Sequence, residues 1–309
     1  MNSLKFDQSK VPLTSEPNSQ AQALADTKPG FQTKQLALAI AKSLVFLFLA
    51  IYGGQPLIGA VSQMLPYVTT QFTAYLIWGL LLLWLVGRFI EKRTLSDYGL
   101  GAKSFWAGLT EFYYGSLIGS LMVTTVTIIL AVLGCYKALG ISTNCQLLEF
   151  IPGLIAAAIF EEILFRGYVL QTIERASNTK IAVIVSSLLF GAAHFNNFQQ
   201  SVPLFDQIVS CTALGLDAGL LFCAAYLYTR RLWLAAGLHA FWNIFEGPVF
   251  GTPVSGMHMG EPLIFSGLNG PPWLTGGVFG PEASIVELLV CLLLAWTIWQ
   301  RKVAADRIS

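Results

Sequence analysis

The segment FEEILFR, residues 160–166, places two adjacent carboxylates and a guanidinium inside a stretch that is otherwise apolar. Each charged side chain near the centre of a bilayer costs about 2.5–3.5 kcal/mol on insertion scales, so Glu161, Glu162 and Arg166 together need a compensating use. Neighbouring residues diverge by about 100° around a helix, whereas residues four apart share a face. We therefore expect Glu162 to pair with Arg166, which leaves Glu161 facing elsewhere.

Two histidines occur at helical spacing from other site-forming residue types in two further apolar stretches. His194 ends FGAAH, four residues after Phe190, and His239 begins HAFWN, four residues before Asn243. At about 1.5 Å per residue, Glu161, both histidines and the asparagine lie roughly 12–20 Å along their helices, near one depth. The spacing predicts one buried site, with Phe190 as an aromatic wall beside the imidazole.

The chemistry available to these residue types is hydrolysis of an acyl bond. A glutamate beside a histidine can take a proton from water and make it a nucleophile. An imidazole N–H and an asparagine amide can donate to the oxyanion of a tetrahedral intermediate. Alternatively, Glu161, His194 and His239 form a two-histidine, one-carboxylate set of the kind that holds catalytic zinc with an open position. Neither alternative needs a serine or cysteine nucleophile.

The elements that must position these residues are membrane helices. Of the 309 residues, 55% are hydrophobic and only 11% are charged, and the mean hydropathy is +0.63. A spanning helix needs about 20 mostly apolar residues. Eight runs meet this need: 36–52, 73–90, 106–133, 148–172, 181–198, 205–228, 231–249 and 284–300. The predicted fold is all-α, a polytopic membrane protein with about eight transmembrane helices around an intramembrane active-site cavity.

The basic residues predict the orientation of this bundle, because Lys and Arg concentrate in cytoplasmic connections. Fifteen of the eighteen lie in the tails and alternate connections on one side: Lys5, Lys10, Lys28, Lys34, Arg88, Lys92, Arg93, Lys103, Arg175, Lys180, Arg230, Arg231, Arg301, Lys302 and Arg307. Only Lys137 lies in a connection on the other side. We expect a multi-pass protein of the cell membrane with both termini cytoplasmic. Residues 1–34 are predicted to be a disordered polar tail, 35–302 the membrane-embedded protease domain and 303–309 a cytoplasmic tail.

The three motifs EEILFR, FGAAH and HAFWN, in this order on three predicted membrane helices, resemble the CPBP family. That family comprises CAAX-processing proteases and bacteriocin-processing or self-immunity (Abi) proteins, with the motifs EExxxR, FxxxH and Hxxx(N/B). The motif-bearing core covers residues 148–250. The resemblance implies an intramembrane endopeptidase of a bacterial type, with a cavity open to the cytoplasm, acting on membrane-associated or lipidated proteins or peptides. It also implies that Glu162 and Arg166 form a supporting ion pair.

The same resemblance implies roles for the remaining site residues. Glu161 would activate water with the help of His194, and His239 and Asn243 would stabilise the oxyanion. The family is described both as metalloproteases and as metal-free enzymes, so the zinc alternative stays open, since the chain lacks HExxH. The expected partners are a membrane-associated protein or peptide substrate and the lipid bilayer. A net charge of +1 excludes a broadly basic nucleic-acid-binding surface.

Two other functions are compatible with the same residues. A non-proteolytic scaffold or bacteriocin-immunity protein would bind a membrane partner through the same cavity, and a proton-coupled transporter would use Glu161, Asp217 and the histidines as a relay. No internal repeat is visible, which counts against a transporter.

Cys135 and Cys145 share an outer loop and could form a disulfide or remain two thiols. The glycine-rich connection 250–283 is expected either to fold back over the outer mouth or to be a mobile loop, while Glu287, near a helix end, is expected to be solvated.

Overall fold

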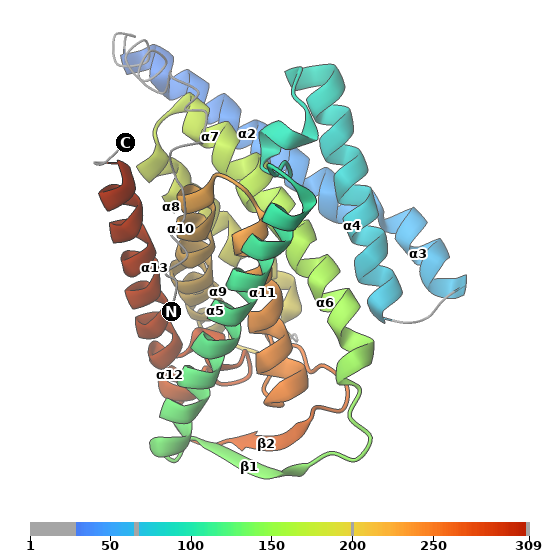
Figure 1. Ribbon diagram of the computed structural model, residues 1–309, viewed down its shortest axis with the longest axis vertical. Helices are drawn as coiled ribbons and strands as arrows, with labels where there is room; N and C mark the ends of the chain where they lie inside the picture. Colours follow the sequence, from blue (N-terminus) through green and yellow to red (C-terminus); the bar gives the residue numbers. More distant parts are fainter. Residues whose placement is uncertain (1–28, 65–67, 199–200, 307–309) are drawn as a thin grey trace.

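The computed structural model describes residues 29–64, 68–198 and 201–306, and Figure 1 shows a bundle of long helices with a two-stranded sheet at one end. Each of the eight predicted apolar runs falls on a helix or on consecutive helical segments. The helices in chain order are α2 (Pro29–Tyr52), α3 (Gln55–Met64), α4 (Val68–Leu85), α5 (Phe105–Val132), α6 (Leu147–Glu162), α7 (Gln171–Ala176), α8 (Thr179–Ala193), α9 (Leu204–Leu214), α10 (Leu220–Thr229), α11 (Trp233–Ile244), α12 (Pro272–Thr275) and α13 (Ile285–Asp306).

Shorter π-helical and 3₁₀ turns extend or join these helices. The π-helical segments are η2 (Val86–Glu91), η4 (Ile163–Leu170), η6 (Gly215–Gly219) and η7 (Phe245–Val249). The 3₁₀ turns are η3 (Leu95–Tyr98), η5 (His194–Asn197) and η8 (Pro281–Ala283). Helix α6 thus continues through η4 into α7. The π-helical turn begins directly after Glu162, and such turns occur frequently at functional sites.

Five helical stretches in the described part of the chain are long and apolar enough to cross a membrane: Thr33–Tyr52, Thr69–Glu91, Phe105–Val132, Thr179–Asn197 and Leu204–Thr229. Several large apolar side chains of these helices are exposed, among them Phe48, Ile77 and Leu121. Five such stretches indicate a polytopic membrane protein. The helix α6–η4 is not among them, since its motif adds charged side chains to the apolar run.

Two predicted features need correction, and one helix continues past a predicted limit. Helix α2 begins at Pro29 and not at residue 35, because proline suits the first turn of a helix, where its missing N–H is not needed. The rest of the predicted tail, residues 1–28, lies outside the described residues. Helix α13 continues to Asp306, past the predicted boundary at residue 302, since lysine and alanine favour helix. The all-α prediction missed the sheet.

The sheet pairs strand β1 (Tyr136–Ile141) with strand β2 (Ile264–Leu268) in antiparallel fashion, with an irregularity between Ala138 and Gly140. It joins the α5–α6 connection to the 250–283 connection at the lower end of the bundle in Figure 1. This connection therefore packs against the bundle. Cys135 and Cys145, on either side of β1, are both free thiols.

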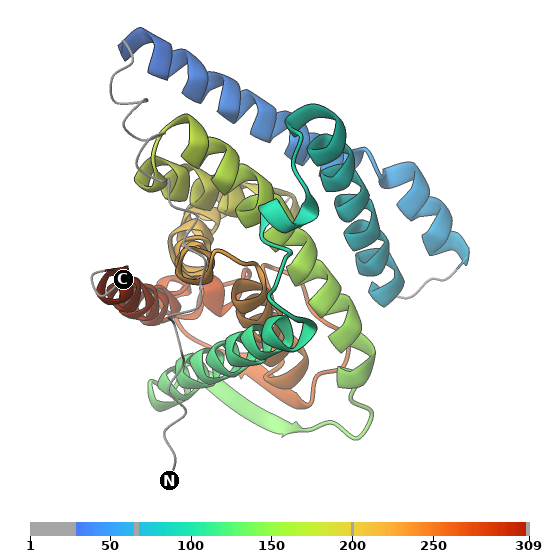
Figure 2. The same ribbon diagram turned by 45° about the horizontal axis from the view of Figure 1, so that its top comes forward.

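Close helix contacts hold the motif-bearing helices in place, and α6–η4 lies at the centre of the core. Helices α5 and α11 approach through glycines: a Cβ at Gly119 would lie 2.3 Å from the Leu238 carbonyl oxygen, and one at Gly237 would lie 2.1 Å from that of Phe112. Small residues at such contacts are typical of packed membrane helices. The contact fixes α11, which carries the third motif, against α5, as the two views in Figures 1 and 2 show.

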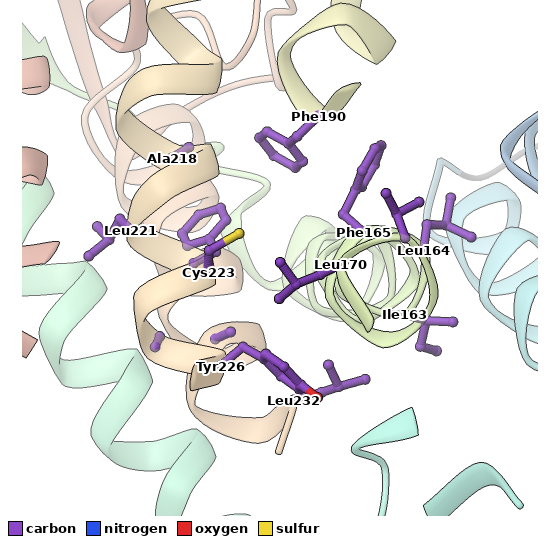
Figure 3. Close-up of a cluster of buried hydrophobic side chains, with 14 of the residues drawn as sticks. Ile163, Leu164, Phe165, Leu170, Phe190, Ala218, Leu221, Cys223, Tyr226 and Leu232 are labelled. Carbon is purple, nitrogen blue, oxygen red and sulfur yellow. The ribbon is translucent and has the colours of Figure 1, made fainter. Parts of the chain in front are cut away.

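The apolar core packs around η4, the segment that directly follows the two glutamates. Ile163, Leu164, Phe165 and Leu170 of η4 are almost fully buried, and Figure 3 shows Leu170 on the side of the turn that faces α10, with Phe165 near Phe190. A core packed at this density transmits small volume changes to its neighbours. The backbone that presents the two glutamates is therefore rigidly held.

Candidate active site

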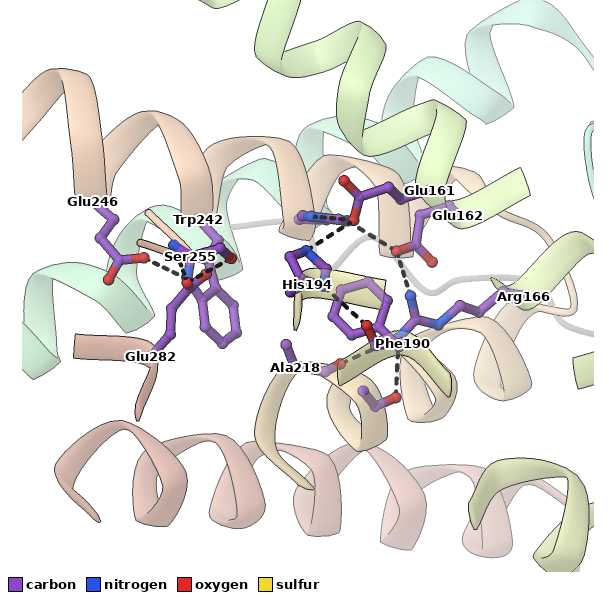
Figure 4. A network of polar contacts seen from close by, with 12 residues as sticks. Glu161, Glu162, Arg166, Phe190, His194, Ala218, Trp242, Glu246, Ser255 and Glu282 are labelled. Carbon is purple, nitrogen blue, oxygen red and sulfur yellow. Dashed lines mark hydrogen bonds and ion pairs between the residues drawn. The ribbon is translucent and has the colours of Figure 1, made fainter. Parts of the chain in front are cut away.

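Three predicted residues from three helices meet in the core. The Oε2 atom of Glu161, near the end of α6, lies 3.7 Å from Nε2 of His194 and 3.8 Å from Nε2 of His239. His194 is the first residue of η5, directly after α8, and His239 lies in the middle of α11. Figure 4 shows Glu161 and His194 pointing toward one another. Both distances exceed that of a direct hydrogen bond.

The second nitrogen of each imidazole is already engaged. Nδ1 of His194 lies 2.9 Å from the carbonyl oxygen of Phe190, and Nδ1 of His239 lies 3.0 Å from Oε1 of Glu162. A carbonyl or carboxylate oxygen only accepts, so both Nδ1 atoms must carry the proton. In the neutral rings both Nε2 atoms then hold a lone pair that faces Glu161. Within the described residues, Oε2 of Glu161 is buried and has no hydrogen-bond partner.

Glu162 and Arg166 form a fully buried ion pair, with Nη1 of Arg166 2.9 Å from Oε1 of Glu162. The same carboxylate oxygen receives His239, so Glu162 joins α6 to α11. Arg166 also donates to the carbonyl oxygens of Gly219, at 3.1 Å, and Ala218, at 3.4 Å. The pair with Arg166 follows from the four-residue spacing, whereas the contact with His239 depends on tertiary packing.

Aromatic rings enclose the charged groups. The Arg166 guanidinium lies 4.5 Å from the ring centre of Phe190 and 5.0 Å from that of Phe222. Phe222 stacks on His239 with the ring centres 4.5 Å apart, and Phe190 lies 5.0 Å from the ring centre of His194. Phe222 was not predicted, because nothing distinguishes it from other apolar residues of its run. These rings lower the local dielectric constant and strengthen the ionic contacts.

Asn243, the fourth predicted catalytic residue, lies one helical turn after His239 and is half-buried. Its amide makes no hydrogen bond to the other residues in the described part of the chain. The indole of the neighbouring Trp242 points to Glu246, with Nε1 2.8 Å from Oε2. Asn243 is thus left with an uncommitted donor on the helix that carries His239.

Two further acidic residues, Glu287 and Asp217, are buried. Glu287 is 1% exposed, with both carboxylate oxygens unpartnered among the described residues, so the predicted solvated carboxylate is wrong. The sequence places it near the start of α13, but the 250–283 connection covers that helix end. Asp217 is fully buried in η6, where its Oδ1 accepts from the Ala218 N–H. His258, in contrast, lies exposed in the outer connection.

Glu161, His194 and His239 are also the predicted zinc ligands. Histidine and glutamate are donors that zinc accepts, at about 2.0–2.2 Å. Among residues 29–64, 68–198 and 201–306, however, no three His, Cys, Asp or Glu side chains form a group that could hold a metal ion. The zinc alternative for Glu161, His194 and His239 therefore stays a prediction, and the chemistry below is derived from the protein's own side chains.

A protein-family model described as type II CAAX prenyl endopeptidase Rce1-like matches residues 143–245. The chain carries a CPBP-family domain. This confirms the resemblance inferred from the three motifs, all of which lie inside the matched residues. A domain of this CAAX protease family implies intramembrane protease activity on a protein or peptide. No curated protein and no solved structure matches the chain.

Proposed function

We propose that this protein is an intramembrane endopeptidase that hydrolyses peptide bonds of membrane-associated or lipidated proteins by means of a water activated by Glu161 and His194. One observation carries the proposal: a buried carboxylate oxygen without a hydrogen-bond partner among the described residues faces the Nε2 atoms of two histidines. A water held between these acceptors can donate both of its protons, one to Glu161 and one to an Nε2 atom. Its lone pairs then remain available for attack.

In the first step the water oxygen bonds to the scissile carbonyl carbon while Glu161 takes a water proton. The carbonyl π electrons move onto its oxygen, which becomes the oxyanion. The C–N bond then breaks, and Glu161 returns the proton to the leaving nitrogen. A general base of this kind contributes about 10²–10⁴-fold to the rate.

The oxyanion is proposed to be stabilised by Asn243 and His239. The Asn243 amide donates directly. Since Nδ1 of His239 already donates to Glu162, its Nε2 can donate only when the ring carries both protons. The Glu162 carboxylate, at 3.0 Å, would stabilise that charge. Glu162 is thereby a positioning residue for His239 as well as the partner of Arg166.

The proposal includes the membrane topology and the side on which the cavity opens. We propose eight transmembrane spans, both termini in the cytoplasm of a cell-membrane protein, and a cavity that opens to that side. Backbone groups in lipid must be hydrogen-bonded internally, so a substrate bond is accessible only in an extended or unwound segment. Reporters fused to each terminus test the orientation.

The direct test is cleavage of a membrane-peptide library by the purified protein in liposomes, with mass spectrometry of the products and metal analysis of the same sample. Cleavage by the wild type and none by Glu161→Gln supports the proposal. Stoichiometric zinc that is lost in His194→Ala together with activity would favour the zinc alternative. Absence of cleavage by well-folded wild type would favour a non-proteolytic scaffold or immunity protein.

A further inference from the structure

The outer connection contacts the chain segment that carries His194. Three residues after His194, the Asn197 side chain donates from Nδ2 to the Ser255 carbonyl oxygen at 3.0 Å. The next residue, Phe198, stacks on Phe279 with the ring centres 5.1 Å apart. Residues of the 250–283 connection therefore contact the last residue of η5 and the residue that follows it.

Ser255 is itself held in an unusual conformation. Its φ is +47°, in the left-handed region that residues with a Cβ rarely adopt. Oε2 of Glu282 accepts from both the Ser255 backbone N–H, at 2.5 Å, and its hydroxyl, at 2.8 Å. Both residues are buried, and the adjacent Gly256 N–H donates to the Phe279 carbonyl oxygen at 2.7 Å. The Glu282 carboxylate thus stabilises a strained backbone whose carbonyl faces Asn197. Ser255 and Glu282 are drawn together in Figure 4.

This arrangement matters at His194 because α8 ends there. The imidazole is fixed to its own helix through the Phe190 carbonyl oxygen, so its position relative to Glu161 follows the end of that helix. The contacts of this end with the outer connection come from Asn197 and Phe198. A misplacement of about 1 Å in a catalytic group can lower the rate about 100-fold.

We propose that Glu282, Ser255 and Asn197 form a strut that positions His194 against Glu161. The inference rests on the proposed function, in which His194 helps to activate water. All three are positioning residues: their hydrogen bonds join them to one another and not to Glu161 or His194, so the strut is expected to act on the turnover rate and to leave substrate binding unchanged.

Adjacent asparagines provide a matched pair for the test. Asn196, in the same turn, donates from Nδ2 to the hydroxyl of Tyr52 on α2 at 3.0 Å and does not contact the strut. Asn197→Ala is expected to lower kcat for peptide cleavage about 10- to 100-fold with KM within about twofold. Asn196→Ala should leave both constants near the wild-type values. Equal kcat in the two variants would overturn the strut, while wild-type cleavage would leave the proposed function intact.

A second pair separates hydrogen bonding from charge at Glu282. Glu282→Gln keeps an oxygen that can accept from Ser255, whereas Glu282→Ala removes it. Rescue of kcat and of the pH profile in the glutamine variant, with loss in the alanine variant, is the expected result. Equal loss in both would show that the carboxylate acts through its charge, and the strut would be wrong.

The strut also has a readout that does not require activity. Diethylpyrocarbonate modifies accessible histidines, and mass spectrometry resolves the reaction at His194 from that at exposed His258. Asn197→Ala should increase the rate at His194 relative to His258, and Asn196→Ala should not. An unchanged ratio contradicts the strut even if the wild-type protein cleaves no peptide. Should Glu282→Ala fail to accumulate, the asparagine pair carries the test by itself.

Discussion

Nδ1 of His239 lies 3.0 Å from Oε1 of Glu162, while Nε2 of the same ring lies 3.8 Å from the neighbouring Glu161. Two glutamates adjacent in the sequence therefore face opposite sides of one imidazole. One is bound to Arg166 and fixes the ring, and the other has a buried oxygen without a hydrogen-bond partner among the described residues. This division underlies the first prediction.

Glu161→Gln and Glu162→Gln should fail in different ways. Glu161→Gln removes the base, so cleavage should fall about 10²–10⁴-fold while abundance and Tm stay near wild type. Glu162→Gln leaves Arg166 buried without its anion and should destabilise the fold by about 3–5 kcal/mol. Cleavage assays with thermal unfolding in detergent measure both effects. An equal loss of Tm in the two variants would contradict the division.

Gly237→Ala should disturb the placement of the third motif. The added Cβ would lie 2.1 Å from the Phe112 carbonyl oxygen, a backbone atom that cannot rotate away, so α5 and α11 must separate. Overpacking of this kind costs about 1–3 kcal/mol, and we expect Tm and cleavage to decrease together. Gly59→Ala in α3 is the control, because nothing lies within 4 Å of the added atom. A Tm for Gly237→Ala equal to that of the control would refute the close contact.

A chelator should leave activity unchanged. The proposed step uses Glu161 and His194 without a metal ion, so dialysis against 1,10-phenanthroline is expected to leave the initial rate of cleavage within error of the untreated sample. Metal analysis before and after dialysis is the accompanying measurement. Loss of activity that zinc restores would support the zinc alternative.

The ion pair between Glu174 and Arg230 should make stability depend on acid pH. Arg230 donates to both oxygens of Glu174, at 2.6 and 3.1 Å, in a region beyond the predicted end of the fourth span at residue 172. Burial raises the pKa of this carboxyl, but the Arg230 hydrogen bonds and charge outweigh it and lower the pKa below its ordinary value of 4.5. A pKa lowered by folding stabilises the protein above the ordinary value, and this stabilisation is lost as the pH falls below it.

The measurement is the Tm difference between wild type and Glu174→Gln as a function of pH. The wild type should be more stable at neutral pH, and the difference should shrink as the pH falls below the ordinary value. A difference that stays constant with pH would mean that the ion pair does not contribute to stability.

The sequence determines the helices and the main polar contacts within them because both depend on short spacing. Apolar runs predicted the long helices of the described chain but not α3 or α12, and the four-residue rule predicted the Glu162–Arg166 pair. The contact between Glu162 and His239, the stacking of Phe222 and the burial of Glu287 join residues far apart in the chain, so no local pattern encodes them. The strands β1 and β2 were missed for the same reason, since each is short and its partner is distant.

The pairing of β1 with β2 has a topological consequence. All three motifs and the whole family-matched segment, residues 143–245, lie between the two strands in the chain. Hydrogen bonds between the strands therefore close this segment into a ring whose beginning and end stay at a fixed separation. Helices α2 to α5 precede β1 in the chain, so the pairing that closes the ring does not involve them.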